Sequence, residues 1–282
     1  QTIALAGVSS NPVLVVGALD TAEPPTDVSL GPTVTTTSGA ITINGAAYVY
    51  GVGFVSATSI VLNGGTDNVA QVYENCAFRT NSASSSGSIN VGASNTQTKS
   101  VHLKNCSMRF SGANNQVIAS GSALIIDGGS VLSGSSTPSN LFVNSNDRSY
   151  GSIDISGFDF SALGSTFNIF AQTVSSAASP AIAAVKNVVR NSKLPASWSG
   201  LLVSGVNGVG QRYEMRNCDS ADTNYRLWVE DYAGSIKTQI TNYVRTGGAS
   251  DGTTGYSFKM TTTANANAIV APLVTPEIII WN

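Results

Sequence analysis

"YENCAF" at residues 73–78 and "LKNCSM" at residues 103–108 share one pattern, and this pattern decides the fold. In each stretch, apolar and polar residues alternate up to an asparagine, and a cysteine follows the asparagine. A third copy, "MRNCDS" at residues 215–220, contains the last of the three cysteines. Asn and Gly tolerate a left-handed backbone best, so each Asn is typical of a tight corner between two strands.

Degenerate copies of the pattern recur along the chain, with Asn or Gly at the corner position. Successive corners are 24, 30, 23, 29, 30, 30 and 25 residues apart, at Gly51, Asn75, Asn105, Gly128, Gly157, Asn187, Asn217 and Asn242. A second strand-like run precedes most corners, so each copy predicts a strand, a variable loop, a second strand, a corner and a third strand. We therefore expect an all-β coil of parallel strands with about eight rungs.

Side chains alternate between the two faces of a strand, so the position two before each corner and the position just after it should face the interior. These residues are Tyr73, Leu103, Ile126, Ile155, Val185, Met215 and Ile240 before the corners, and Val52, Cys76, Cys106, Phe158, Val188 and Cys218 after them. We expect the cysteines to be buried free thiols that act as small apolar residues. The third cysteine lies 112 residues beyond the second, and no CxxC motif exists, which argues against a metal site.

The composition excludes several classes of function. Charged residues make up only 11% of the 282 residues, the net charge is −2, and no basic block is present. We therefore expect no nucleic-acid partner. The longest apolar runs, such as "PVLVVGAL" at residues 12–19, are shorter than the roughly 20 residues that span a bilayer, so we expect no membrane partner.

Composition divides the chain into three parts. Residues 1–40 lie outside the repeat and contain four prolines between positions 12 and 32, which predicts an N-terminal arm or cap. Residues 41–246 form the coil. Residues 247–282 break the pattern and predict a C-terminal strand segment that acts as a cap, an oligomerisation element or a link to a further domain.

From Tyr48 to Arg245, the corner asparagines resemble the stacked asparagines of the pectate-lyase-like superfamily. The resemblance implies a right-handed parallel β-helix, with the asparagines at the tight turn between the second and third sheets. Members of this superfamily include lyases and hydrolases of acidic polysaccharides, which need clustered carboxylates, in some cases with Ca²⁺. The resemblance implies nothing about the activity of this chain.

Asp127, Asp154 and Asp159 are the best candidates for such a carboxylate cluster. However, Asp154 and Asp159 flank one corner, and the bend between them should point their side chains apart. Residues just before the corners form an outward column in which the first three alternate in sign: Glu74, Lys104, Asp127, Ser156, Lys186 and Arg216. We interpret this column as a surface charge ladder that avoids stacking like charges.

We expect no catalytic residue, no cofactor and no metal. The single histidine, His102, should point outward and has no Ser or Cys partner for a triad. Arg79 and Arg109 occupy equivalent outward positions on adjacent rungs and are candidates for contact with a carboxylate, a sulfate or a partner protein. Trp198 is a candidate sugar platform or interface anchor.

The C-terminal stretch "DGTT…SFKM…APLVTPEIIIWN" at residues 251–282 resembles structural proteins of tailed bacteriophages, in which a β-helical domain runs into a C-terminal β-sandwich. The resemblance implies a non-enzymatic virion protein that decorates the capsid or belongs to the tail. Its partners would be the major capsid protein or other virion proteins, and it would be a homo-oligomer, for example a trimer. Two alternatives remain: a tailspike or fibre that binds or cleaves host polysaccharide, and a secreted polysaccharide lyase or adhesin.

Overall fold

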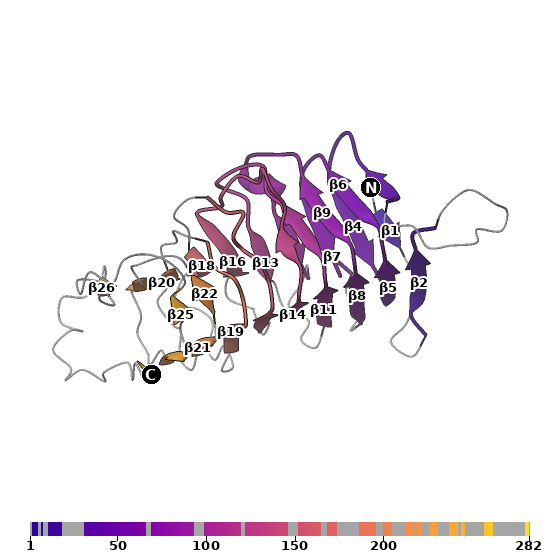
Figure 1. Ribbon diagram of the computed structural model, residues 1–282. Helices are drawn as coiled ribbons and strands as arrows, with labels where there is room; N and C mark the ends of the chain where they lie inside the picture. The colour runs from indigo at the N-terminus through magenta and orange to yellow at the C-terminus, as the bar shows by residue number, and fades with distance from the viewer. Residues whose placement is uncertain are drawn as a thin grey trace, which may run out of the picture.

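The computed structural model describes residues 2–4, 7, 11–18, 31–65, 69–92, 99–119, 122–145, 152–164, 168–173, 186–195, 200–204, 212–216, 218–220, 226–230, 237–241, 244–245, 257–261 and 280–281. These residues form parallel sheets whose strands stack along one axis (Figure 1), from the indigo N-terminal strands to the orange and yellow C-terminal ones. The chain visits the sheets in turn, so each strand pairs with its counterpart from the next turn of the coil. This arrangement confirms the prediction of an all-β fold of parallel strands.

The first sheet contains ten strands among the described residues. They are β1 (Thr2–Ala4), β4 (Ile41–Asn44), β7 (Ile60–Leu62), β10 (Ile89–Val91), β13 (Val117–Ala119), β16 (Asn140–Ser145), β18 (Asn168–Thr173), β20 (Gly200–Ser204), β23 (Arg226–Glu230) and β26 (Ser257–Thr261).

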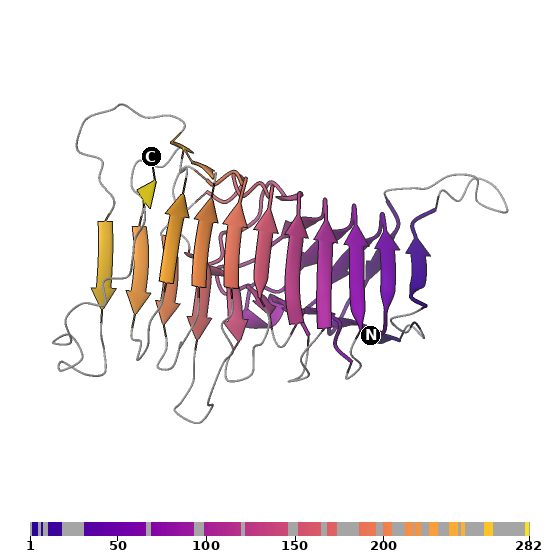
Figure 2. The same cartoon turned by 90° about the horizontal axis from the view of Figure 1, so that it is seen from below.

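The second sheet also contains ten described strands, and Figure 2 shows strands lying side by side along the whole stack. They are β2 (Val13–Val16), β5 (Ala47–Tyr50), β8 (Ala70–Glu74), β11 (Lys99–Lys104), β14 (Ser122–Asp127), β17 (Ile153–Ser156), β19 (Lys186–Arg190), β21 (Arg212–Arg216), β24 (Lys237–Thr241) and β27 (Ile280–Trp281).

The third sheet is shorter. Its strands are β3 (Thr33–Thr35), β6 (Gly53–Ser56), β9 (Ala77–Thr80), β12 (Ser107–Arg109) and β15 (Ser130–Val131), and β22 (Asp219–Ser220) pairs with β25 (Val244–Arg245) further along. Single parallel bridges from Ser130 to Asp159 and from Asp159 to Lys193 continue the third sheet past β15. The one described helical turn is the 3₁₀ turn η1 (Ser85–Gly87).

Left-handed residues stand at the corners between the second and third sheets. The backbone φ is positive at Gly51, Asn75, Asn105, Gly128, Gly157 and Asn191. Five of these corners were predicted from the sequence, and they stack because adjacent strands keep strict register. A second set of left-handed residues, which the repeat pattern did not indicate, follows strands of the first sheet at Gly45, Asn63 and Gly92.

The prediction of a corner at Asn187 was wrong, because Asn191 takes the left-handed conformation in that rung. Asn187 lies inside β19, is fully buried, and pairs with Ile153. The regular spacing of 30 residues favoured Asn187, whereas the coil absorbs four additional residues in the preceding segment. The residue two before this corner is therefore Val189, which is in register with Ile155 and Met215.

The interior is apolar and continuous, as the alternation predicted. Tyr73, Leu103, Ile126 and Ile155 are buried before the corners, and Val52, Cys76, Cys106, Phe158 and Cys218 are buried after them. Val188 is buried too, but it lies within β19 in register with Asp154 and does not follow a corner. Val185 lies outside the described residues, and for Met215 and Ile240 only the backbone is described.

Two clusters of aromatic rings lie in the interior. Phe54 and Phe78 stack with ring centroids 5.5 Å apart, and Tyr73 meets both rings edge-on. Further along the coil, the rings of Phe142, Phe158, Phe160 and Phe170 form the second cluster. Such aromatic packing fixes neighbouring turns against each other.

The first forty residues contribute strands to the same sheets. Val13–Val16 of β2 pairs with Ala47–Tyr50, and Thr33–Thr35 of β3 pairs with β6. The described strands of this segment therefore add one strand to each of the three sheets. The C-terminal segment, expected to break the repeat, also adds one strand to the first sheet and one to the second.

Candidate functional site

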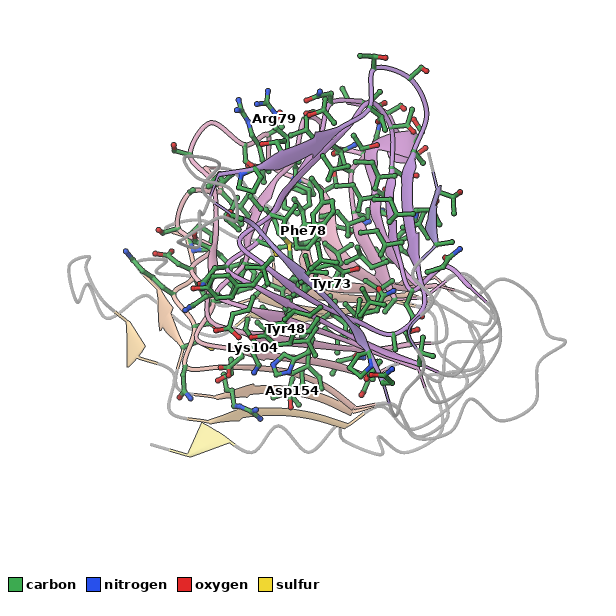
Figure 3. All side chains as sticks on the ribbon, turned by 90° about the vertical axis from the view of Figure 1, so that its right-hand side faces the viewer. Tyr48, Tyr73, Phe78, Arg79, Lys104 and Asp154 are labelled. Atoms are coloured by element: carbon green, nitrogen blue, oxygen red, sulfur yellow. The ribbon has the colours of Figure 1, made fainter. Side chains whose placement is uncertain are left out.

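The outer face of the second sheet contains the expected charge ladder. Lys104 in β11 is in register with Glu74 in β8 on one side and with Asp127 in β14 on the other. Opposite charges in adjacent positions attract each other, so these three residues are electrostatically balanced. Further along the column, Arg190 is in register with Arg216, so the prediction that the column avoids stacking like charges was wrong there. Figure 3 shows Lys104 on the same side of the coil as Tyr48 and Asp154, away from Arg79. In the rung of β19, Arg190 stands in register with Ser156, so Arg190 replaces Lys186 in this column.

The N-terminal end of this face is apolar and aromatic. Leu14 and Val16 are 66% and 39% exposed, and they are in register with Tyr48 and Tyr50. The Tyr48 hydroxyl donates a hydrogen bond to the Glu74 carboxylate, and this bond, together with burial, raises the pKa of Tyr48. The hydroxyl of Tyr48 is therefore already engaged within the chain.

The three candidate aspartates are separated and do not form one cluster. Asp154 forms an ion pair with Arg190 at 3.2 Å on the outer face of the second sheet. Asp159 lies beyond the corner, on the third sheet, where it pairs with Lys193 at 3.8 Å and accepts a hydrogen bond from the Ser161 N–H. Asp127 belongs to the charge ladder. The bend at Gly157 thus separates Asp154 from Asp159, as the sequence predicted.

Metal coordination has no support within the described part of the chain. Its His, Cys, Asp and Glu side chains form no group of three or more that could hold a metal ion. His102 points outward between the buried Val101 and Leu103, and its pKa is lowered by burial and by the neighbouring Lys104.

All three cysteines are buried free thiols, as predicted. The thiols of Cys76, Cys106 and Cys218 donate to the carbonyls of Val49, Tyr73 and Val189, each two positions before the corner of the preceding turn. The pKa of Cys106 is raised by its hydrogen bond with the Cys76 thiol and by burial. A buried, protonated thiol is a poor nucleophile.

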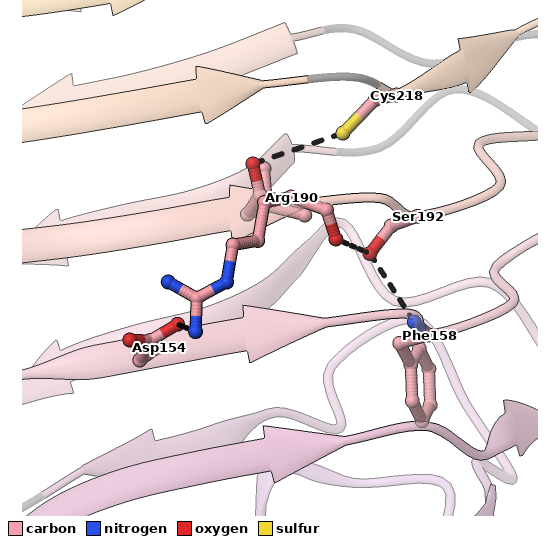
Figure 4. Close-up of polar contacts among 6 residues, drawn as sticks. Asp154, Phe158, Arg190, Ser192 and Cys218 are labelled. Carbon is pink, nitrogen blue, oxygen red and sulfur yellow. Dashed lines mark hydrogen bonds and ion pairs between the residues drawn. The ribbon is translucent and has the colours of Figure 1, made fainter.

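Ser192 takes the place of the cysteine in the rung where the corner was mispredicted (Figure 4). Its hydroxyl donates to the Arg190 carbonyl at 2.8 Å and accepts from the Phe158 N–H at 3.2 Å. Cys76 and Cys106 make the equivalent bond to the carbonyl two residues before them. "RNS" at residues 190–192 matches "RNC" at residues 216–218, and this match was the sequence signal for the true corner.

The two candidate arginines lie next to each other on the outer face of the third sheet. Arg79 in β9 is in register with Arg109 in β12. Arg79 is exposed and points away from the core in Figure 3, and Arg109 is partly exposed. The last candidate, Trp198, lies outside the described residues. Among the residues that it describes, the structure therefore brings together the two arginines but not the three aspartates.

An asparagine in the loops is a feature that the sequence analysis missed. The buried Asn115 side chain accepts from the N–H groups of Ser111 and Gly112 and donates to the carbonyls of Ser82 and Ser84. It thereby joins the loop after β9 to the loop after β12. Nothing in the spacing of the repeat marks this residue.

No family model matches the chain, and searches of curated proteins and of solved structures gave no match either. In the described part of the chain, no helix has the length and apolar character needed to cross a membrane.

Proposed function

We propose that this chain is a non-enzymatic structural protein of a tailed-phage virion, which decorates or stabilises the capsid or serves as an accessory part of the tail. The observation that carries this proposal is the coil itself. Ten strands in each of two sheets are hydrogen-bonded to their neighbours along the stack, around a filled interior. Such an assembly resists bending and pulling because each inner strand is paired on both sides.

The charge arrangement agrees with a structural role. Asp154 and Asp159 each have a basic partner, and Glu74 and Asp127 flank Lys104. A hydrolase of polysaccharides would instead need two acids facing one bond, about 5–10 Å apart.

The coil is, in this proposal, a right-handed parallel β-helix of the pectate-lyase-like type. Connections between parallel strands of one sheet are right-handed in almost all known proteins, which supports this hand. The stacked left-handed asparagines at residues 75 and 105 support the superfamily, because they occupy the turn between the second and third sheets. The chain would bind the major capsid protein or another virion protein, and would form a homo-oligomer.

A tailspike or fibre that binds host polysaccharide is the second candidate. The observation in its favour is a strip on the second sheet in which the exposed Leu14 and Val16 lie beside the half-buried Tyr48 and Tyr50. Aromatic rings beside apolar side chains can stack against sugar rings.

Quantitative mass spectrometry of purified phage particles that carry this chain tests the proposal. The major capsid protein and the tail-tube protein of the same particles supply the internal copy-number scale, and residual host proteins supply the background. Hundreds of copies for each particle are expected of a capsid decoration, and a few to some tens would place the chain in the tail and favour the spike. Absence above background would refute a virion role.

A further inference from the structure

The outer face of the third sheet contains a like-charged pair, Arg79 and Arg109, on directly adjacent strands. Within the described residues, neither guanidinium takes part in a hydrogen bond or an ion pair. Like charges directly opposite each other on neighbouring strands destabilise a sheet. The pair therefore has an unfavourable effect on folding that no acid in the described part of the chain offsets.

The same two rungs balance their charges on the second sheet. There, Lys104 lies between Glu74 and Asp127. Elsewhere, the basic residues Arg190 and Lys193 each face an aspartate. Lys186, Arg212 and Lys237 are also in register along the second sheet. Among the basic residues whose side chains the structure describes, Arg79 and Arg109 are the stacked pair without an acidic partner, so an anionic partner could bind both.

The surroundings of the two arginines fit a protein partner. In register with Arg79, Val55 of β6 supplies an apolar contact. From β6 to β15 the neighbouring outward column consists of the small residues Gly53, Ala77, Ser107 and Ser130, and beyond β15 it continues into the ion-paired Asp159 and Lys193. Small side chains let a partner backbone approach closely, and Arg is enriched in protein interfaces. The described residues of this face include no aromatic ring on which a sugar could stack.

The spacing of the two arginines fits two acids on one helix. Adjacent strands lie about 4.8 Å apart, and side chains at i and i+4 of a helix have Cβ atoms about 5–6 Å apart. Each guanidinium can hold one carboxylate through two parallel N–H···O bonds.

We propose that the outer face of the third sheet docks an acidic helical segment of another protein, with Arg79 and Arg109 each binding one of two carboxylates at i and i+4. In the virion this segment would belong to the protein that the coil decorates. That placement rests on the proposed function, whereas binding of the acidic helix does not.

A binding titration with the full chain tests the proposal. The probe is a fluorescent, alanine-based helical peptide with two glutamates at i and i+4, and the comparison peptide has the same composition with the glutamates at i and i+2. The protein variants are R79Q, R109Q and, as the matched control, K104Q, which removes one positive charge from the rung of Arg109 but on the second sheet. Fluorescence anisotropy at low salt gives each dissociation constant.

The i, i+4 peptide is expected to bind the wild type, and each arginine variant should weaken binding about tenfold or more, since hydrogen bonds to charged groups are strong. K104Q should change the dissociation constant less than about twofold, and the i, i+2 peptide should bind more weakly. An equal loss of peptide affinity in R79Q and K104Q would overturn the proposal, and so would equal affinity of the wild type for both peptides. So would a polyuronate that binds through the arginines more tightly than the peptide, because the partner would then be a polysaccharide.

Thermal unfolding of the same variants separates binding from folding. Removal of one of two like charges should leave the melting temperature of R79Q equal to or above that of the wild type. A clear decrease would mean that the arginines support the fold, and would also overturn the proposal. The titration is independent of particle composition, so absence of the chain from virions would refute the proposed function and leave the docking result unchanged.

Discussion

A left-handed backbone at each corner lets the chain turn from the second sheet to the third within one or two residues. Asn is used at residues 75, 105 and 191, and Gly at residues 51, 128 and 157. In an L-residue with a larger side chain this conformation costs roughly 1–2 kcal/mol. At the corner after β14, Gly128 is followed by a second left-handed residue, Gly129, whose φ is +96°.

Gly129→Ala should be much more destabilising than Gly39→Ala. Both glycines have positive φ, but a Cβ on Gly129 would lie 2.0 Å from the Cys106 carbonyl oxygen, whereas one on Gly39 meets nothing within 4 Å. The backbone conformational cost is shared, so the difference should be the overpacking cost, about 1–3 kcal/mol. Urea unfolding of both variants measures it, and equal losses of unfolding free energy would contradict this account of the corner.

Alkaline pH should destabilise the protein through Cys106 and Tyr73. Burial raises the pKa of Tyr73, and the bond to Cys76 together with burial raises that of Cys106. Their unfolded values are about 10 for Tyr and about 8.5 for Cys, so the folded state holds these protons more tightly. Their contribution to stability is therefore complete below the unfolded pKa and is lost as pH rises above it.

The unfolding free energy, measured with urea at several pH values, should decline from pH about 8 upwards. In C106A, the early part of this decline should become smaller, because the thiol with the raised pKa is removed and the raised pKa of Tyr73 remains. A free energy that stays constant from pH about 7 to about 10 would show that the two groups ionise as easily in the folded protein as in the unfolded one.

At the scale of the elements, strict register explains what the sequence could predict. The corner pattern gave the inward residues and the pairing of Arg79 with Arg109, because one fixed residue in a strand determines the faces of all the others. It failed at β19, where two asparagines four residues apart compete and the regular spacing favoured the wrong one. That error placed Lys186 in the charge ladder and hid the ion pair between Arg190 and Asp154.

The short end strands and the loop contacts could not be predicted from the sequence, for a different reason. β1 and β3 contain three residues each, which is too short to show an alternation, and Pro32 directly precedes β3. Long-range contacts of a loop asparagine depend on the stacking of turns. Asn115, for example, binds carbonyls more than thirty positions earlier in the chain.

Asn115→Ala should be strongly destabilising because it removes four hydrogen bonds to two loops. Backbone groups left without partners make the expected loss of unfolding free energy about 2–4 kcal/mol. Asn114→Ala is the matched control, since Asn114 is exposed, and it should change stability by less than about 0.5 kcal/mol. Similar losses in the two variants, measured by urea unfolding, would show that Asn115 does not tie the loops together.

At the scale of the whole molecule, the coil makes distance along the axis depend on the number of turns and not on the number of residues between two positions. Val16, Tyr50, Glu74, Lys104, Asp127, Ser156 and Arg190 form one column on the second sheet. Counted from the strand of Val16, the strand of Lys104 is the third along the sheet, that of Ser156 is the fifth, and that of Arg190 is the sixth. This column includes Arg190 of β19, the strand after which the corner lies at Asn191 and not at the predicted Asn187.

Distances between spin labels along this column test the coil most directly. One label replaces Val16 and the second replaces Lys104, Ser156 or Arg190 in turn, with the three buried native cysteines changed to alanine to keep labelling specific. Dipolar electron paramagnetic resonance should give separations of about 14, 24 and 29 Å, in steps of about 4.8 Å for each strand. A separation to residue 190 equal to or shorter than that to residue 156 would contradict the stacked coil.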